Sequence, residues 1–181
     1  MKILHVISSL EVGGAQRLLS DFLPLLNKKG KNISLLVFNE VYSDFECTIR
    51  ESGIKIITLS FSNFYSPLII FNFFKHFKQY DIIHAHLFPT LYWVAFAARL
   101  TSKPIVYTEH STSNRRRGKT YWRLIEKFIY RSYKNIASIS MQVQSNLKLW
   151  LSVQSDDKRF VVIENGVKIN DYKNAIKLDK I

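Results

Sequence analysis

The chain has 181 residues and a formal charge of +12 at neutral pH, with 26 Lys and Arg against 14 Asp and Glu. Its apolar content of 47% and charged content of 22% are ordinary for a folded domain and exclude a chain that is disordered throughout. The single cysteine, Cys47, excludes an intramolecular disulfide and a cysteine-cluster zinc site, while the excess of cations predicts an anionic partner such as nucleic acid, a phospholipid surface or a phosphorylated ligand.

Strand and helix patterns alternate from the first residues onward. An apolar run at 2–9 has the length of a buried strand, the pair Gly13 and Gly14 breaks the chain, and apolar residues then recur at helical spacing from Ala15 to Lys29. The alternation continues, with further strands predicted at 32–39, 54–61, 81–86, 104–108, 135–140 and 159–164 and further helices at 44–52, 66–79, 89–101, 119–134 and 142–152.

Strands that are apolar on both faces and alternate with amphipathic helices indicate a parallel sheet that helices cover on both sides. We therefore predict an α/β fold that is Rossmann-like and doubly wound, with a mainly parallel sheet of about seven strands. In such a sheet the ligand binds at the carboxyl ends of the strands, so functional residues are expected just after each strand.

The turn after the first strand contains the glycine pair. Gly13 and Gly14 let the backbone approach a ligand closely, and they precede a helix whose free amides and dipole favour an anion. A simple turn is the alternative interpretation. A dinucleotide fingerprint needs a third glycine that this loop lacks, which disfavours a nucleotide-dependent oxidoreductase.

Histidines follow two of the predicted strands. Alternation places His84 and His86 on one face of their strand, but a metal site needs further ligands that the sequence does not reveal. We therefore expect a structural hydrogen bond from His84, whereas His86 is nearer the strand end. His110 follows the next strand and has the chemistry to donate to a phosphate or a sugar hydroxyl; an ordinary surface histidine is the alternative.

The segment between the fifth and sixth predicted strands is strongly basic and contains one acidic residue, Glu126. Tyr121, Leu124 and Phe128 share one face of its predicted helix, and the cations share another. Such a helix suits an anionic membrane surface; the alternative is a solvated helix whose apolar side packs on the sheet. Nucleic acid is indicated by charge alone, so no nucleic-acid partner is predicted. The cations are Arg115, Arg116, Arg117, Lys119, Arg123, Lys127, Arg131 and Lys134.

An aromatic segment adds to the membrane hypothesis, because it has too many rings to be all core. The longest purely apolar run, 91–98, is far shorter than the roughly 20 residues of a membrane-spanning helix, and the first residues contain no secretory cleavage pattern. We therefore expect a cytoplasmic protein, with peripheral contact at the inner face of the cell membrane. The aromatic residues are Phe61, Phe64, Tyr65, Phe71, Phe73, Phe74 and Phe77.

Four segments occur in an order and spacing typical of one family. The first joins the strand 2–7 to Gly13-Gly14-Ala15-Gln16, and the others are Asp81–His86, Thr108–Ser111 and Val162–Val167. Together they resemble the N-terminal, acceptor-side domain of a family-4 glycosyltransferase with the GT-B fold, over about residues 1–170.

The resemblance implies a retaining transferase that moves a sugar from a nucleotide-sugar donor to a glycan or lipid-linked acceptor, without a bound metal or other cofactor. It implies a role in cell-surface polysaccharide or glycolipid synthesis. Gly13 and Gly14 match the loop whose amides meet the donor diphosphate, and His110 matches the histidine beside the reacting sugar, which we assign to catalysis. The acceptor-binding residues expected from these segments are Gln16, His86 and Ser111.

The chain covers only part of what this family contains. We expect an N-terminal Rossmann-like domain at 1–167 and the start of an interdomain linker at 168–181, followed in the family by a donor-binding C-terminal domain. Without that domain, in cis or in trans, the chain is expected to be inactive or nearly so. The alternative is a non-catalytic module of the same fold that docks on an anionic membrane or on a catalytic partner subunit.

Overall fold

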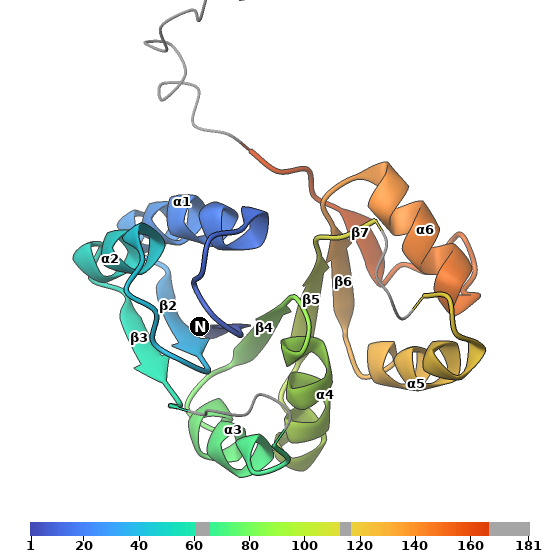
Figure 1. Ribbon diagram of the computed structural model, residues 1–181, viewed down its shortest axis with the longest axis horizontal. Helices are drawn as coiled ribbons and strands as arrows, with labels where there is room; N and C mark the ends of the chain where they lie inside the picture. Colours follow the sequence, from blue (N-terminus) through green and yellow to red (C-terminus); the bar gives the residue numbers. More distant parts are fainter. Residues whose placement is uncertain (61–65, 113–116, 167–181) are drawn as a thin grey trace, which may run out of the picture.

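The computed structural model describes residues 1–60, 66–112 and 117–166, and its strands and helices alternate as predicted (Figure 1). The elements are β1 (Lys2–Ile7), α1 (Gly14–Lys28), β2 (Asn32–Val37), α2 (Asp44–Glu51), β3 (Lys55–Thr58), α3 (Ile69–Phe77), β4 (Ile82–His86), α4 (Thr90–Thr101), β5 (Ile105–Glu109), α5 (Thr120–Tyr130), β6 (Asn135–Ser138), α6 (Met141–Leu151) and β7 (Phe160–Val162).

The strands form one seven-stranded sheet in the order β3-β2-β1-β4-β5-β6-β7, and every pair is parallel. The predicted Rossmann-like α/β fold is therefore confirmed. β1 lies between β2 and β4, which is where the strand order reverses. A doubly wound sheet opens a crevice at that point, along the carboxyl ends of its strands.

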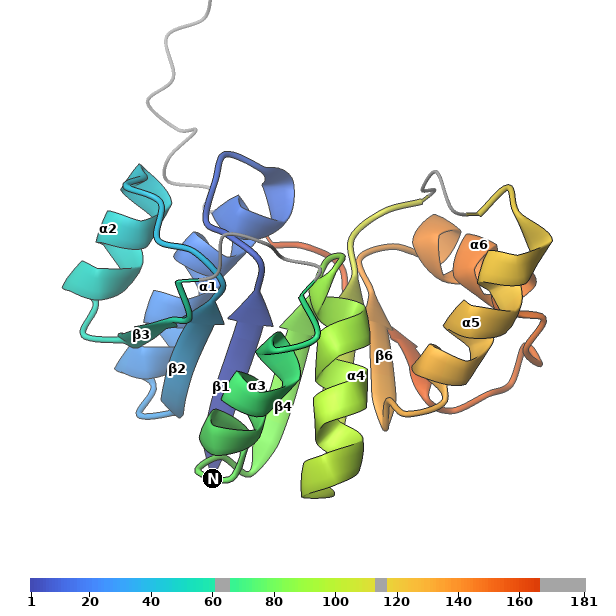
Figure 2. The ribbon, with the colours of Figure 1, turned by 60° about the horizontal axis from the view of Figure 1, so that its bottom comes forward.

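Side chains of each strand alternate between two helix layers. Leu4 and Val6 of β1 face the larger core, which α3, α4, α5 and α6 cover. Ile3 and Ile7 face the smaller core, which α1 and α2 cover. Figure 2 shows α3 and α4 in front of the sheet and α1 and α2 behind β2 and β3.

Local capping explains where some helices begin. The Ser43 hydroxyl accepts a hydrogen bond from the Glu46 amide at 3.2 Å at the start of α2. Ser140 does the same for Val143 at the start of α6, at 3.3 Å. Each hydroxyl satisfies one backbone donor that the helix leaves unpaired.

The structure differs from the sequence expectation at α3. The sequence predicts a helix at 66–79, but α3 begins at Ile69 and ends at Phe77. The amides of Ile69 and Ile70 bond back to the carbonyls of Ser66 and Pro67, which closes tight turns ahead of the helix. The predicted linker at 168–181 lies outside the described residues and stays a prediction.

Candidate functional site

The loop after β1 leads directly into an uncapped helix. Gly13 is the N-cap of α1, with extended backbone (φ −178°, ψ 162°) and no side chain to bond the helix amides. The first turn of α1 contains no acidic residue. Among the described residues, no side chain caps this end, so its amides and the positive end of the helix dipole are available to an anion.

Gly13 lies against the end of the Gln16 side chain. A Cβ built on Gly13 would lie 2.5 Å from the Oε1 atom of Gln16, whose side chain is buried. A Cβ on Gly14 would meet nothing within 4 Å. The two glycines therefore differ: Gly13 makes room for the Gln16 amide, and Gly14 leaves the helix start open.

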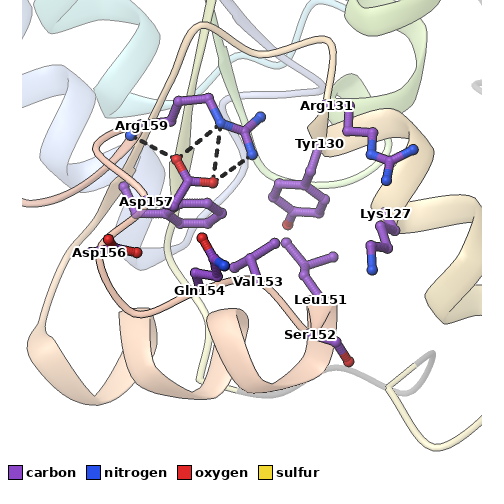
Figure 3. A pocket seen from close by; sticks show the side chains of 11 residues that line it. Lys127, Tyr130, Arg131, Leu151, Ser152, Val153, Gln154, Asp156, Asp157 and Arg159 are labelled. Atoms are coloured by element: carbon purple, nitrogen blue, oxygen red, sulfur yellow. Dashed lines mark hydrogen bonds and ion pairs between the residues drawn. The ribbon is translucent and has the colours of Figure 1, made fainter.

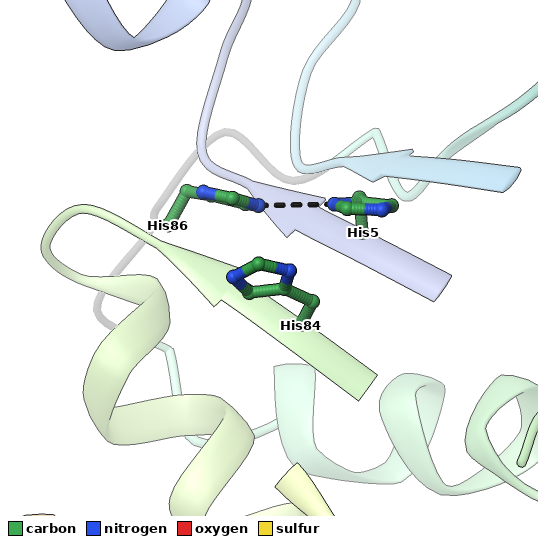
Figure 4. A group of neighbouring side chains, drawn as sticks. All are labelled: His5, His84 and His86. Carbon is green, nitrogen blue, oxygen red and sulfur yellow. Dashed lines mark hydrogen bonds between the residues drawn. The ribbon is translucent and has the colours of Figure 1, made fainter. Parts of the chain in front are cut away.

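A chain of histidine rings crosses the strands beside this loop. The Nδ1 atom of His5, on β1, lies 3.1 Å from Nε2 of His86 at the end of β4 (Figure 4). The Nδ1 atom of His86 lies 3.4 Å from Nε2 of His110, the residue that follows β5. The parallel register pairs His5 with His84 and His86 with Thr108, which puts all these side chains on one face.

Burial keeps these histidines uncharged. It lowers the pKa of His5 and of His110 from 6.5 to about 4. It also lowers the pKa of His84 and His86 well below 6.5, and the neighbouring histidines lower both further. The cause is that a cationic imidazole loses its hydration in the interior and repels its neighbours. At neutral pH the four rings are therefore neutral.

His84 is the structural histidine that the sequence suggested. Its Nε2 atom lies 2.8 Å from the Thr108 hydroxyl on β5, within the same sheet face. Its ring contacts that of His86 in a tilted arrangement, with centroids 4.2 Å apart and planes at 32°. His84 thus packs against the ring of His86 and forms a side-chain hydrogen bond between β4 and β5.

His5, His84 and His86 also each offer a ring nitrogen within 4.8 Å of the others, which makes them a candidate metal set. Metal binding requires their lone pairs to converge on one point. His5 and His86 already use a ring nitrogen each in a hydrogen bond to one another, and the Nε2 atom of His84 is engaged by the Thr108 hydroxyl. The geometry favours a hydrogen-bonded chain over a metal centre.

A buried carboxylate holds the segment after β5. Glu109 forms an ion pair with Arg117 at 2.7 Å and accepts a hydrogen bond from the Tyr130 hydroxyl at 2.8 Å. The Ser111 amide donates to its other oxygen at 3.3 Å. Burial raises the pKa of Glu109, although Arg117 and Tyr130 oppose that shift. We call Glu109, Ser111, Arg117 and Tyr130 the Glu109 clamp, and it fixes the backbone on both sides of His110.

A cavity of about 420 Å³ opens next to the histidine chain. Its polar lining includes His84, His86 and Thr108, and its apolar lining comes from α1 and from strands β5 to β7. The apolar lining residues are Leu18, Leu19, Phe22, Val106, Ala137, Ile139, Val161 and Ile163.

A second cavity, of about 490 Å³, lies between the end of α5, the end of α6 and the start of β7 (Figure 3). It is at the amino edge of the sheet, away from His110. Its Arg159 is paired with Asp157 at 2.7 Å, so that cation is already neutralised. Of the predicted site residues, His86 lines the first cavity, whereas Lys127 and Arg131 line this one.

The outer face of α5 differs from the solvated alternative. Its apolar residues Tyr121, Leu124, Ile125 and Phe128 do not pack on the sheet but are 42–67% exposed. The buried side of α5 instead contains Glu126, Ile129 and Tyr130, with Trp122 partly buried. Lys119, Arg123 and Arg131 are exposed and Lys127 is half-buried.

Several predicted residues take unexpected places. Arg117, assigned to the anionic surface, is instead in the Glu109 clamp, with its side chain 7% exposed, because Glu109 needs a cation in the interior. Arg115 and Arg116 lie outside the described residues, as do Phe61, Phe64 and Tyr65. Phe73 and Phe77 are core, whereas Phe71 is exposed.

The described part of the chain contains no helix that is both long and apolar enough to cross a membrane. Sequence reasoning also missed His5 and Thr108, and it did not assign Glu109. The alternation of strand side chains could have indicated His5. The parallel register pairs His5 with His84, so His5 lies on the same face of the sheet as His84 and His86.

Known proteins share this sequence pattern and this fold. The family model described as Glycosyltransferase Family 4 matches residues 12–171. No curated protein matches the chain at a significant level. The family match covers most of the described residues, including the loop of Gly13, the histidine chain except His5, and the Glu109 clamp.

Solved structures match the fold at low sequence identity. HepE from Anabaena, in complex with UDP and glucose, has a TM-score of 0.77 and 20% identity, over 95% of this chain and 46% of its own. A glycosyltransferase from Rickettsia africae has a TM-score of 0.74 and 21% identity, over 97% and 46%. The lipopolysaccharide outer core galactosyltransferase WaaB has a TM-score of 0.66 and 18% identity, over 93% and 47%. This chain therefore spans about half the length of each.

Proposed function

Because the chain belongs to glycosyltransferase family 4, we propose that it is the acceptor-side domain of a retaining enzyme that transfers a sugar from a nucleotide-sugar to a glycan or lipid-linked acceptor. The solved HepE complexes contain UDP, UDP with glucose, or UDP-glucose, which supports a nucleotide-sugar as the donor. We place the reaction in the synthesis of a cell-surface polysaccharide or glycolipid.

The observation that carries this proposal is the arrangement at the carboxyl edge of the sheet. The open start of α1 at Gly14 and the ring of His110 lie along one edge, and the histidine chain joins β1 to the end of β5. When the bond between sugar and diphosphate breaks, negative charge grows on the departing diphosphate. Helix amides stabilise that charge, and His110 holds the sugar in position for the acceptor.

We expect His110→Ala to lower kcat/KM for sugar transfer by about 100-fold, the loss typical of one hydrogen-bond donor at a reacting centre. The measurement is a transfer assay on this chain joined to a donor-binding domain. His76→Ala, on α3 and outside the site, is the matched control and should retain the native rate. Native activity in a folded His110→Ala variant would contradict the assignment.

We further propose that α3, α4 and α5 present a surface to anionic lipid. Besides the exposed apolar residues of α5, Phe71 on α3 and Leu100 on α4 are 73% and 61% exposed. The only carboxylate in these three helices is Glu126, which is fully buried. A surface with exposed rings and cations and without exposed acids is attracted to anionic headgroups and inserts its apolar side chains between them.

Vesicle sedimentation tests this surface. The chain should bind vesicles of mixed anionic and neutral lipid and bind purely neutral vesicles weakly, and added salt should reduce the binding. The double variant Leu124→Ser, Phe128→Ser should lose binding to the anionic vesicles. Leu25→Ser, an exposed leucine of α1 on the other sheet face, is the control. Equally weak binding to both vesicle types would end the membrane proposal.

The same surface supports the alternative of a non-catalytic module that docks on a membrane or on a catalytic subunit. Vesicle binding and transfer activity, measured on the same chain, distinguish the transferase domain from the non-catalytic module. A chain that binds anionic vesicles, yet confers no transfer activity when joined to an active donor-binding domain, would favour the module.

A further inference from the structure

The histidine chain has a direction that its hydrogen bonds determine. A neutral imidazole has one N–H donor and one lone pair, so a bond at one nitrogen determines where the proton resides. His86 is engaged through both nitrogens, to His5 through Nε2 and to His110 through Nδ1. It must therefore donate to one neighbour and accept from the other, and two arrangements remain.

In the first arrangement the Nδ1 atoms of His5, His86 and His110 are all protonated; in the second, the Nε2 atoms are. The inner end of the chain separates them. The Nε2 atom of His5 is buried and has no hydrogen-bond partner among the described residues. The second arrangement would leave an unpaired N–H donor there, which is rare and costly in a protein interior, whereas the first leaves only a lone pair.

The first arrangement also determines the tautomer at the outer end of the chain. In the first arrangement His110 accepts from His86 at Nε2, so its proton is on Nδ1, the nitrogen not used by the chain. We propose that His5 and His86 are positioning residues that hold His110 in its Nδ1–H tautomer, ready to donate to an oxygen of the donor substrate. The substrate contact rests on the proposed function, but the tautomer does not.

The lowered pKa values fit a chain of neutral rings, which both arrangements require, because a protonated ring would have two donors and would break the sequence of donor and acceptor. Ring contacts restrict the geometry further. The rings of His5 and His86 are nearly coplanar in orientation, with 15° between their planes. The rings of His86 and His110 are 5.7 Å apart at 45°.

Nuclear magnetic resonance of the 181-residue chain labelled with 15N-histidine tests the proposal at pH 7, because protonated and unprotonated ring nitrogens give separate signals. We expect the Nδ1–H tautomer for His5, His86 and His110. His5→Phe should convert His86 and His110 to a mixture of tautomers, while His76 on α3 should not change. His5→Asn should restore His110, since the Asn amide also donates to Nε2 of His86.

An Nε2–H tautomer at His110 or His86 in the native chain would overturn the proposal. So would a His110 signal that His5→Phe leaves unaltered in a folded variant. The same spectra can be recorded during titration with Zn²⁺. Saturable binding that shifts the ring-nitrogen signals of His5, His84 and His86 together would make this cluster a metal site and overturn the proposal. If the tautomers are as expected but His110→Ala retains transfer activity, the histidine chain stands and the catalytic assignment fails.

Discussion

Acidification from pH 7 to pH 5 is expected to destabilise the folded chain by about 4 kcal/mol through His5 and His110 alone. Burial lowers the pKa of both from 6.5 to about 4. Between these values the unfolded chain binds protons that the folded chain excludes, so the free energy of unfolding decreases as the pH falls. Each histidine contributes about 2 kcal/mol over this interval. His84 and His86, shifted in the same direction, add to the loss.

Denaturant unfolding at several pH values between 7 and 5 measures this effect, in a range where most carboxylates are already ionised. His110→Asn should reduce the dependence of unfolding free energy on pH by up to about 1.4 kcal/mol per pH unit, because one titrating group is removed. His76→Gln should leave most of it in place. A native chain that is equally stable at pH 7 and pH 5 would show that these rings are hydrated.

Glu126→Ala is expected to lower the free energy of unfolding by about 2–5 kcal/mol. Glu126 is fully buried and accepts hydrogen bonds from the Tyr92 hydroxyl at 2.9 Å and the Trp150 indole at 2.7 Å. These bonds join α4, α5 and α6 around one carboxylate. Truncation leaves both donors without this acceptor, and an unpaired buried donor costs about 1–3 kcal/mol.

Denaturant midpoints of two further variants make this prediction specific. Glu126→Gln retains one acceptor oxygen and should lose less than Glu126→Ala. Glu51→Ala, at an exposed position of α2, should change stability by no more than about 0.5 kcal/mol. Equal midpoints for Glu126→Ala and Glu51→Ala would contradict the role of Glu126 as a buried acceptor.

The order of elements and the fold class were predictable because both depend on local patterns. Apolar runs such as 32–39 have the length of a strand buried on both faces, and glycines or capping serines separate them from helices. The histidine chain was less accessible. It depends on the register of β1 against β4 and of β4 against β5, which brings His5, His86 and His110 together from distant parts of the sequence.

The orientation of α5 was not predictable from periodicity. Two stripes of large side chains run along this helix, and the one with Tyr121, Leu124 and Phe128 has the stronger apolar character. The buried stripe contains Glu126, a residue type that usually faces solvent. Its burial depends on the Tyr92 hydroxyl of α4 and the Trp150 indole of α6, which donate hydrogen bonds to it and are distant in the sequence. Arg117 was misassigned for the same reason, since its partner Glu109 is a strand residue.

The Glu109 clamp connects two surfaces that otherwise seem independent. Arg117 precedes α5 by a few residues and Tyr130 is its last residue, so Glu109 holds this helix from both ends. Glu109 is also the residue before His110. Because the clamp links α5 to the residue before His110, a displacement of α5 would also move the backbone beside His110.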